Sequence, residues 1–311
     1  MIQERMSLKD KNWFKTGGHA RFFCAPTTPT EMKEACLWAN EHKQPRYILG
    51  EGSNILISDE GFDGLIIQPK ITSIEQTNQI NDTVYVTIGS GLSMDNAIQW
   101  CLLHSIIGLE EFSGIPGTIG GSVYINLHYY QFLLEHFLHS AQVMDVHTGI
   151  TQTVQKEWFN FGYNQSTLQQ KHHILLNATF ILKKVSDIEI AYAQGRRAEI
   201  IRHRIARYPN KNTCGSFFRN FHDDEVTIIN NGKKMIYVAY YLDKIGVKGS
   251  LHVGDAIVSY QHANMIVNKG NATSTDIIEL ARCMQKKVYD CFEIIPQPEC
   301  QFVGFNYNPL L

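Results

Sequence analysis

The stretch Glu111–Asn126, EFSGIPGTIGGSVYIN, decides how the rest of this sequence is interpreted. It places four glycines and one proline in the eight residues from Gly114 to Gly121. A surface turn needs only one or two such residues, because glycine supplies positive φ angles and proline fixes a single φ angle. We therefore expect a ligand to lie against this backbone, where side chains would be in the way.

Two phosphate-binding motifs can be tested against the glycines. A P-loop needs G-x-x-x-x-G-K-[ST], which no segment provides. The dinucleotide fingerprint G-x-G-x-x-G is incomplete at Gly50–Ile55 and at Gly89–Met94, since both lack the third glycine. Separate glycine loops remain at Lys15–Ala20, Leu49–Asn54 and Gly114–Gly121, and each alone could be an ordinary tight turn. Three together favour a long ligand that carries a pyrophosphate and a flat ring.

Composition argues against several other classes of protein. The chain has 311 residues, enough for two or three domains, and its net charge of −2 provides no basic field for nucleic acid. Its seven cysteines lack any Cys-x-x-Cys pair, as expected for free thiols in a reducing cytosol. No apolar run approaches the ~20 residues that a membrane-spanning helix needs. Neighbouring histidines lack further ligands at metal-site spacing. We expect a cytoplasmic protein without metal, nucleic-acid partner or membrane partner.

Hydrophobic periodicity predicts an α+β protein. Helices are expected at residues 28–42, 94–104, about 186–208, 235–246 and 274–292, and short strands at 46–50, 54–58, 64–68, 83–89, 141–146, 173–184, 255–259 and 264–268. The first helix has Thr28 as N-cap, Pro29 at its first position and Glu31 closing a capping box. The apolar segment 131–140 also looks helical. A change of character near residues 185–195 indicates a domain boundary.

Ordered motifs along nearly the whole chain resemble one family. They are FKTGGHA (14–20), LGEGSNILI (49–57), GFDGLII (61–67), the stretch 108–126, FGYNQS (161–166), RYPNKNTCGSFFRN (207–220), VSYQHANMIVNKGNAT (258–273) and PQPECQFVG (296–304). Their order and approximate spacing are similar to those of the UDP-N-acetylenolpyruvoylglucosamine reductase family. The resemblance implies a two-lobed FAD-binding domain of the vanillyl-alcohol-oxidase type at 1–185, with lobes of about 1–70 and 71–185. An α/β substrate-binding domain is implied at 195–305.

The family's activity would then be this chain's activity. It is the NADPH-dependent reduction, through bound FAD, of the UDP-sugar enolpyruvyl ether UDP-N-acetylglucosamine enolpyruvate. The product is UDP-N-acetylmuramate, a peptidoglycan precursor. Cofactor and substrate are both small molecules, and no seam or patch in the sequence marks an oligomer interface. We expect a monomer.

The resemblance also assigns residues to the ligands. In the family, the loop here at Gly114–Gly121 packs against the flavin and the loop at Gly50–Asn54 holds the pyrophosphate, so that a Cβ would collide with the cofactor. The implied cofactor-binding residues are Gly17, Gly50, Gly52, Ser53, Asn54, Gly114, Ile115, Gly117, Thr118, Gly120, Gly121, Asn126 and Arg204. The implied substrate-binding residues are Arg207, Asn220, Ser259 and His262.

Two residues match catalytic positions of the family. Ser216 stands where the family carries the serine that gives a proton to the developing carbanion, and Glu299 matches a glutamate near the enol carboxyl. Without the resemblance, Ser216 would more simply be a turn serine that bonds its own backbone. Glu299 would be a solvated loop residue.

Two departures from the family motifs leave the activity open. Asn164, the third expected catalytic residue, replaces an arginine that stabilises the enolate, and losing such a donor costs about 10²–10³ in turnover. Asn126–Gln131 reads NLHYYQ where the family has NAGAYG, which puts Leu127 and His128 in place of small residues. Three hypotheses stand: an active reductase, a flavoenzyme of the same fold with another substrate, and a non-catalytic homologue that binds FAD or a nucleotide sugar.

Overall fold

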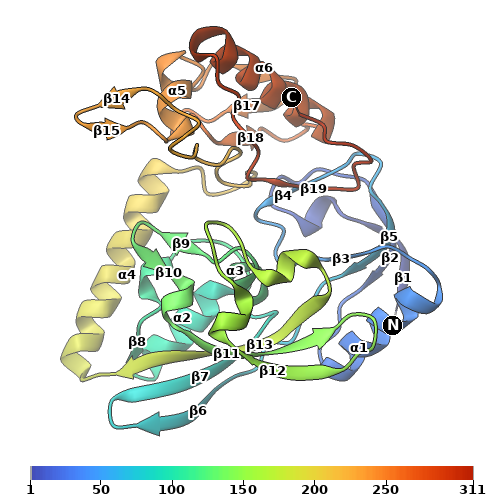
Figure 1. Ribbon diagram of the computed structural model, residues 1–311, viewed down its shortest axis with the longest axis vertical. Coiled ribbons are helices and arrows are strands. Elements are labelled where there is room, and N and C mark those ends of the chain that lie inside the picture. The colour runs from blue at the N-terminus through green and yellow to red at the C-terminus, as the bar shows by residue number, and fades with distance from the viewer. Residues whose placement is uncertain (1, 311) are drawn as a thin grey trace. The chain divides into compact units, whose positions relative to one another are not determined.

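The computed structural model describes residues 2–310, which form two compact units. Within these residues, the glycine-loop unit comprises 2–4, Phe22–Glu51 and Gly64–Arg204, and the C-terminal unit comprises Arg5–Arg21, Gly52–Asp63 and 205–310. Helix α4 (Asp187–Arg207), the long helix drawn in yellow in Figure 1, covers the region where the sequence indicates a domain boundary. The domain limits expected from the sequence stay predictions.

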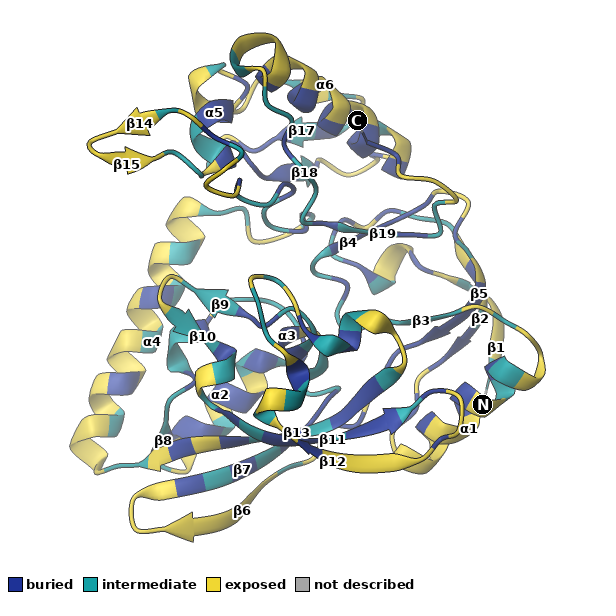
Figure 2. Cartoon of the chain, viewed as in Figure 1, coloured by how far each residue is buried: buried dark blue, intermediate teal, exposed yellow. Residues whose placement is uncertain are grey.

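The glycine-loop unit is built on an antiparallel sheet. Its strand order is β12 (Thr151–Gln155), β11 (Leu138–Asp145), β13 (His173–Lys184), β7 (Thr83–Gly89), β6 (Ile74–Ile80), with β8 (Ile106–Ile107) also pairing with β13. Ala178, on the long strand β13, lies opposite Ala141 on β11 and Ile88 on β7. Buried positions recur along these three strands (Figure 2). The apolar side chains at these positions pack with those of helices α2 (Met94–Leu103) and α3 (Ile119–Tyr124) into one hydrophobic core.

A second core lies beneath helix α1 (Pro29–Glu41). A four-stranded sheet has the order β1 (Gln3–Ser7), β2 (His19–Cys24), β5 (Phe62–Ile67), β3 (Arg46–Ile48). Met32 and Cys36 of α1 are fully buried in this core. Thr28 caps the helix as predicted, accepting from the N–H of Glu31 at 3.1 Å. The main backbone partner of the Glu31 carboxylate is the N–H of Thr27 at 2.6 Å, one residue before the N-cap, so the expected capping box is displaced by one residue.

The C-terminal unit combines small sheets with two helices. Its elements are the parallel pair β4 (Ile55–Ile57) and β19 (Gln301–Val303), the antiparallel sheet β16 (His252–Val253), β17 (Ala256–Val258), β18 (Ile266–Asn268), the hairpin β14 (Ile229–Asn230), β15 (Lys233–Lys234), and the helices α5 (Val238–Lys244) and α6 (Ser274–Phe292). One face of α6 is buried, at Ile277, Ala281, Met284 and Val288. Thr273 and Asp276 form a capping box at its start.

Two helix predictions are wrong in part. Segment 131–140 is not helical: β9 (His128–Tyr129) and β10 (Phe132–Leu133) form a hairpin, followed by a 3-10 turn at Leu134–His136 and by β11. Phe132 and Leu133 pair antiparallel with Tyr129 and His128, so the start of the segment is extended and not helical. Helix α5 begins at Val238 and not at 235, because Met235 donates its N–H to the carbonyl of Ile228 in an extended segment.

The remaining short elements are 3-10 turns at Lys9–Lys11, Glu110–Phe112, Lys156–Phe159 and Thr167–Gln170. Between residues 2 and 310, every helix is too short or too polar to cross a lipid bilayer.

Candidate functional site

The loop Gly114–Gly121, called here the glycine loop, is held on both sides of Gly117. Gly117 has a φ of +142°, which side chains rarely adopt. Its N–H donates to the Glu51 carboxylate at 2.9 Å, and its carbonyl accepts from the N–H of Met94 at 2.9 Å. Thr118 follows as the N-cap of α3 and accepts from the N–H of Gly121 at 3.2 Å. The conformation of this loop is therefore set by contacts with two distant segments.

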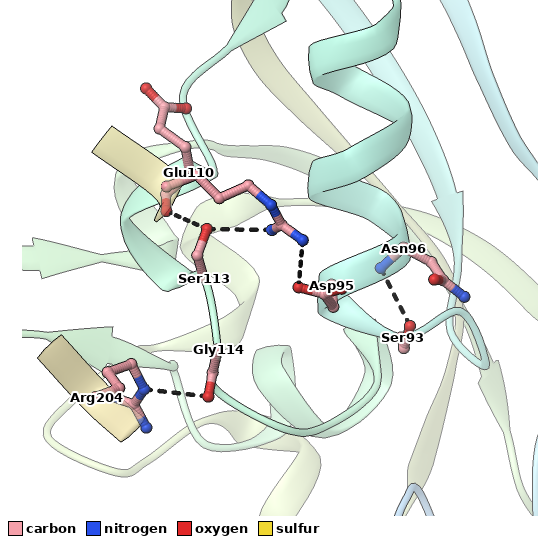
Figure 3. A network of polar contacts seen from close by, with 8 residues as sticks. Ser93, Asp95, Asn96, Glu110, Ser113, Gly114 and Arg204 are labelled. Carbon is pink, nitrogen blue, oxygen red and sulfur yellow. Dashed lines mark hydrogen bonds and ion pairs between the residues drawn. The ribbon is translucent and has the colours of Figure 1, made fainter. Parts of the chain in front are cut away.

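Helix α4 supports the start of the same loop with arginines. The Arg204 Nε donates to the carbonyl of Gly114 at 3.1 Å (Figure 3). Arg197 donates to the buried hydroxyl of Ser113 at 3.3 Å and to the Asp95 carboxylate at 2.8 Å. Arg204, predicted to bind the cofactor, is thus brought to the glycine loop. The polar face of α4 that carries Arg197 and Arg204 thus supports the start of the loop.

Several glycines are required by the protein itself. A Cβ at Gly50 would lie 2.9 Å from the Thr118 hydroxyl, and one at Gly120 would lie 3.0 Å from the carbonyl of Ser90. A Cβ at Gly52 would lie 2.5 Å from a backbone carbonyl. The expected reason for these glycines was collision with a cofactor, but contacts between chain segments already restrict side chains at these positions, most strictly at Gly52. At Gly121 the nearest atom is 3.6 Å away, so that position is less crowded.

Two buried polar atoms of these loops fit a ligand rich in oxygens. Asn54 Oδ1 and Ser90 Oγ have no hydrogen-bond partner among the described residues. Leaving such groups unpaired costs free energy, and native structures pair most of them. Taken singly, the Ser90 hydroxyl could donate to a phosphate or ribityl oxygen of FAD, and Asn54 Oδ1 could accept from a ribityl or ribose hydroxyl, so each residue fits the cofactor. Ser90 was not predicted to bind a ligand, although it lies in the second incomplete glycine fingerprint, Gly89–Met94.

Asn126 and Asn164 are tied into one local structure. The buried Asn126 donates from Nδ2 to the carbonyl of Gly162 at 3.3 Å and accepts from the N–H of Glu135 at 3.2 Å. Gly162 and Gln165 close a turn by two backbone hydrogen bonds of 3.1 and 3.2 Å. Asn164 has a φ of +54° within that turn. The contacts of Asn126 are with the chain itself, and its assignment to the cofactor stays a prediction.

The two departures from the family motifs lie side by side. The ring of His128 packs against the ring of Tyr163 with their centroids 5.0 Å apart. Burial lowers the pKa of His128, which favours the neutral imidazole. His128, which replaces a small residue in the motif Asn126–Gln131, therefore contacts the turn in which Asn164 replaces the family arginine.

Ser216 and Glu299 lie on neighbouring segments of the C-terminal unit. The carbonyl of Phe217 accepts from the N–H of Glu299 at 2.9 Å, and Ser216 forms a β-bridge with Met265. The side chain of Asn264 accepts from the N–H of Phe218 at 3.1 Å and donates to its carbonyl at 2.7 Å. The structure thus brings together the two residues predicted for catalysis, both half-buried. Asn264 holds the segment that follows Ser216 by these two bonds, a role that its position in the sequence did not reveal.

The residues predicted for substrate binding are in part close together. The Tyr208 ring lies 5.4 Å from the ring of His262, and the Arg207 guanidinium lies 6.0 Å from the same Tyr208 ring. Burial lowers the pKa of His262, and its Nδ1 has no partner among the described residues. Ser259 is buried and accepts from the N–H of Gln261 at 3.0 Å.

Asn220 lies in a segment stabilised by an ion pair. Its carbonyl accepts from Arg219 at 2.9 Å, and the same guanidinium makes a bidentate pair with Glu225 at 2.7 and 2.8 Å. Within residues 2–310, no three His, Cys, Asp or Glu side chains gather in a way that could hold a metal ion.

Comparison with known proteins divides the chain into two matched regions. A family model described as FAD binding domain matches residues 20–155. A second, described as UDP-N-acetylenolpyruvoylglucosamine reductase, C-terminal domain, matches residues 208–303. These matches confirm the predicted order of an FAD-binding region followed by a C-terminal domain.

Full-length relatives carry the same name. UDP-N-acetylenolpyruvoylglucosamine reductase of Acaryochloris marina is 32% identical over 304 residues, covering 97% of this chain and 93% of the relative. The reductase of Clostridium botulinum strain Okra is 30% identical over 302 residues, covering 97% and 92%. The crystal structure of the Thermus caldophilus reductase matches with a TM-score of 0.78 and 26% identity, covering 97% of this chain and all of that one.

Proposed function

The chain belongs to the UDP-N-acetylenolpyruvoylglucosamine reductase family, and we propose that it performs that family's reaction. The reaction reduces the enolpyruvyl ether of UDP-N-acetylglucosamine to UDP-N-acetylmuramate in peptidoglycan precursor synthesis. The chain is accordingly an FAD-dependent oxidoreductase that uses NADPH. The observation that carries the proposal is a relative of this name at 32% identity over 97% of the chain, with both matched regions in order.

The cofactor is assigned to the loops on which the predicted residues lie. The glycine loop would receive the flavin through its backbone, with Ile115, Thr118 and Gly121 among the contacts. Residues Gly50–Asn54, with Gly17, would hold the pyrophosphate through N–H groups and the side chains of Ser53 and Asn54. Bound there, FAD would supply the chemistry of hydride transfer between NADPH and the enolpyruvyl double bond.

Three residues are assigned to the proton and to the developing charge. Ser216 would donate its hydroxyl proton to the carbon next to the carboxylate; a serine is a weak acid, but a carbanion is a strong base that can take its proton. Glu299, on the adjoining segment, would assist at the enol carboxyl. Asn164 would offer its amide as a neutral donor to the enolate oxygen. The backbone bond between the Phe217 carbonyl and Glu299 supports a common role for the first two.

The substrate is assigned to four further residues. Arg207 would pair with its diphosphate, because guanidinium groups match phosphate oxygens. Asn220, Ser259 and His262 would contact the rest of the UDP-sugar. We also propose that the chain is a monomer and acts in the cytoplasm. Sedimentation of the purified protein tests the first of these.

A catalytically impaired homologue is the second candidate, because Asn164 cannot supply the charge of an arginine. The deciding experiment measures NADPH oxidation by FAD-loaded protein with UDP-N-acetylglucosamine enolpyruvate, and identifies the product by mass spectrometry. The proposal predicts oxidation that depends on this substrate and a product two mass units heavier, since the double bond gains two hydrogens. UDP-N-acetylglucosamine, which lacks the double bond, is the control. A rate of NADPH oxidation that is the same with and without the enolpyruvyl compound would contradict the proposal.

A further inference from the structure

A carboxylate lies in the middle of the loop assigned to the cofactor's pyrophosphate. Glu51 separates Gly50 from Gly52, and negative charge near a diphosphate is unfavourable. Its side chain is half-buried, and its Oε2 accepts from the N–H of Gly117 at 2.9 Å. The carboxylate is therefore directed at the glycine loop, 66 residues further along the chain.

The backbone that carries Glu51 is itself fixed. The carbonyl of Gly50 accepts from the Gln68 side chain at 2.9 Å. Gly50 also packs so closely on Thr118 that a Cβ would lie 2.9 Å from its hydroxyl. The carboxylate thus extends from a rigid segment, and its acceptor oxygen is held in place before any cofactor binds.

The other partner, Gly117, needs such a restraint. Glycine has the greatest backbone freedom in the unbound chain, and its φ of +142° is one of many angles open to it. Its carbonyl is held by Met94, and the start of the loop is held by Arg204 at Gly114. The N–H of Gly117 is the other polar backbone group of this residue. It donates a charge-assisted hydrogen bond to Glu51, and such a bond is stronger than one between neutral groups.

We propose that Glu51 is a positioning residue for FAD: by accepting the N–H of Gly117, it fixes the glycine loop in the conformation that receives the flavin. The inference rests on the proposed function only in requiring that the chain bind FAD. A loop ordered in advance binds its ligand more tightly, because binding then does not have to order the loop. Glu51 takes no part in the transfer of hydride or proton.

The test compares Glu51→Ala with Glu51→Gln in the full-length chain freed of FAD. The dissociation constant of FAD is measured by the change in flavin fluorescence on titration, and the visible circular dichroism of the bound flavin reports its surroundings. The alanine variant is expected to bind about tenfold or more weakly, as for loss of a hydrogen bond to a charged group, and to show an altered flavin spectrum. Glutamine can accept the same N–H, so it should restore most of the affinity and the spectrum.

Glu31→Ala is the matched control, because the Glu31 carboxylate also accepts a backbone N–H, that of Thr27, in a helix cap. It should leave the FAD affinity and spectrum unchanged. Should Glu51→Ala fail to fold, Glu51→Asp replaces it: the charge stays but the shorter side chain falls short of Gly117, and weak binding is again expected.

Three outcomes overturn the inference. In the first, Glu51→Ala, or Glu51→Asp in its place, binds FAD with the affinity and spectrum of the unmodified chain. In the second, Glu51→Gln binds FAD as weakly as Glu51→Ala does, which would mean that the charge of Glu51, and not its hydrogen bond, determines the affinity. In the third, the unmodified chain does not bind FAD at all. FAD binding without substrate-dependent turnover would refute the proposed reaction and leave the role of Glu51 standing.

Discussion

At residue scale, Asn164 combines a backbone role with a proposed chemical one. Its φ of +54° suits asparagine and glycine, whereas other side chains are strained there. The Gln169 side chain donates to its carbonyl at 2.7 Å, which holds this conformation. The position at which asparagine replaces the family arginine, residue 164, is therefore one whose backbone conformation favours asparagine.

Substitutions at Asn164 separate the two roles. Asn164→Ala should lower the free energy of unfolding in urea by about 1 kcal/mol, and Asn164→Gly should lower it less, because glycine tolerates positive φ. Both lose the amide, so both should slow substrate-dependent NADPH oxidation, by up to about 10²-fold. Equal stability of the alanine and glycine variants would refute the backbone role. Unchanged turnover in the glycine variant would refute the proposed chemical role.

The sequence predicted where the glycine loops are, but not what holds them. Gly117 was singled out by composition alone, whereas its partner Glu51 is distant in the chain and belongs to a motif read as a phosphate loop. The contacts of Asn264 could not be predicted either, because its two bonds to Phe218 join segments far apart in the sequence. Local patterns indicate a loop; only the fold shows which side chains reach it.

At the scale of elements, short apolar segments were the hardest to predict. The long helix α6, which has a regular apolar stripe and a capping box, was predicted with its observed bounds, Ser274–Phe292. Segment 131–140 has a similar apolar content but forms a hairpin strand and a 3-10 turn, since Leu134 donates its N–H to Leu127 at 2.8 Å. Periodicity over so few residues does not separate a helix from a hairpin.

The segment that follows Ser216 carries a pH-dependent contribution to stability. The Arg219 guanidinium, followed by the backbone N–H of His222, holds the pKa of Glu225 at about 2, below its ordinary 4.5. The Glu225 carboxylate therefore binds a proton less readily in the folded chain than in the unfolded chain. The stabilisation is complete above pH 4.5 and is lost as the pH falls toward 2.

Glu225→Gln tests this contribution by urea unfolding over the same pH range. The unmodified chain should be more stable than the variant above pH 4.5, by about 1 kcal/mol, because the 34% exposure of the Glu225 side chain lets solvent screen the pair. The difference should shrink as the pH falls toward 2. A difference that is constant with pH would show that the pair does not act through this carboxylate.

At the scale of the whole molecule, the proposed chemistry is divided between the two units. The glycine loop and its supports Glu51, Arg197 and Arg204 belong to the glycine-loop unit. Ser216 and Glu299 belong to the C-terminal unit. The proposal accordingly separates hydride uptake from NADPH, which needs only the bound cofactor, from reduction of the enolpyruvyl group, which also needs the proton of Ser216.

The most direct test follows the flavin absorbance of the FAD-loaded protein without oxygen, first with NADPH and then with UDP-N-acetylglucosamine enolpyruvate. The unmodified chain should lose the absorbance with NADPH and regain it with the enolpyruvyl compound. Ser216→Ala should lose it equally fast and regain it at least about 100-fold more slowly, because the proton donor is gone. Ser250→Ala, an exposed serine of the same unit, should behave as the unmodified chain. Recovery in Ser216→Ala at the unmodified rate, or no recovery in the unmodified chain, would contradict the account.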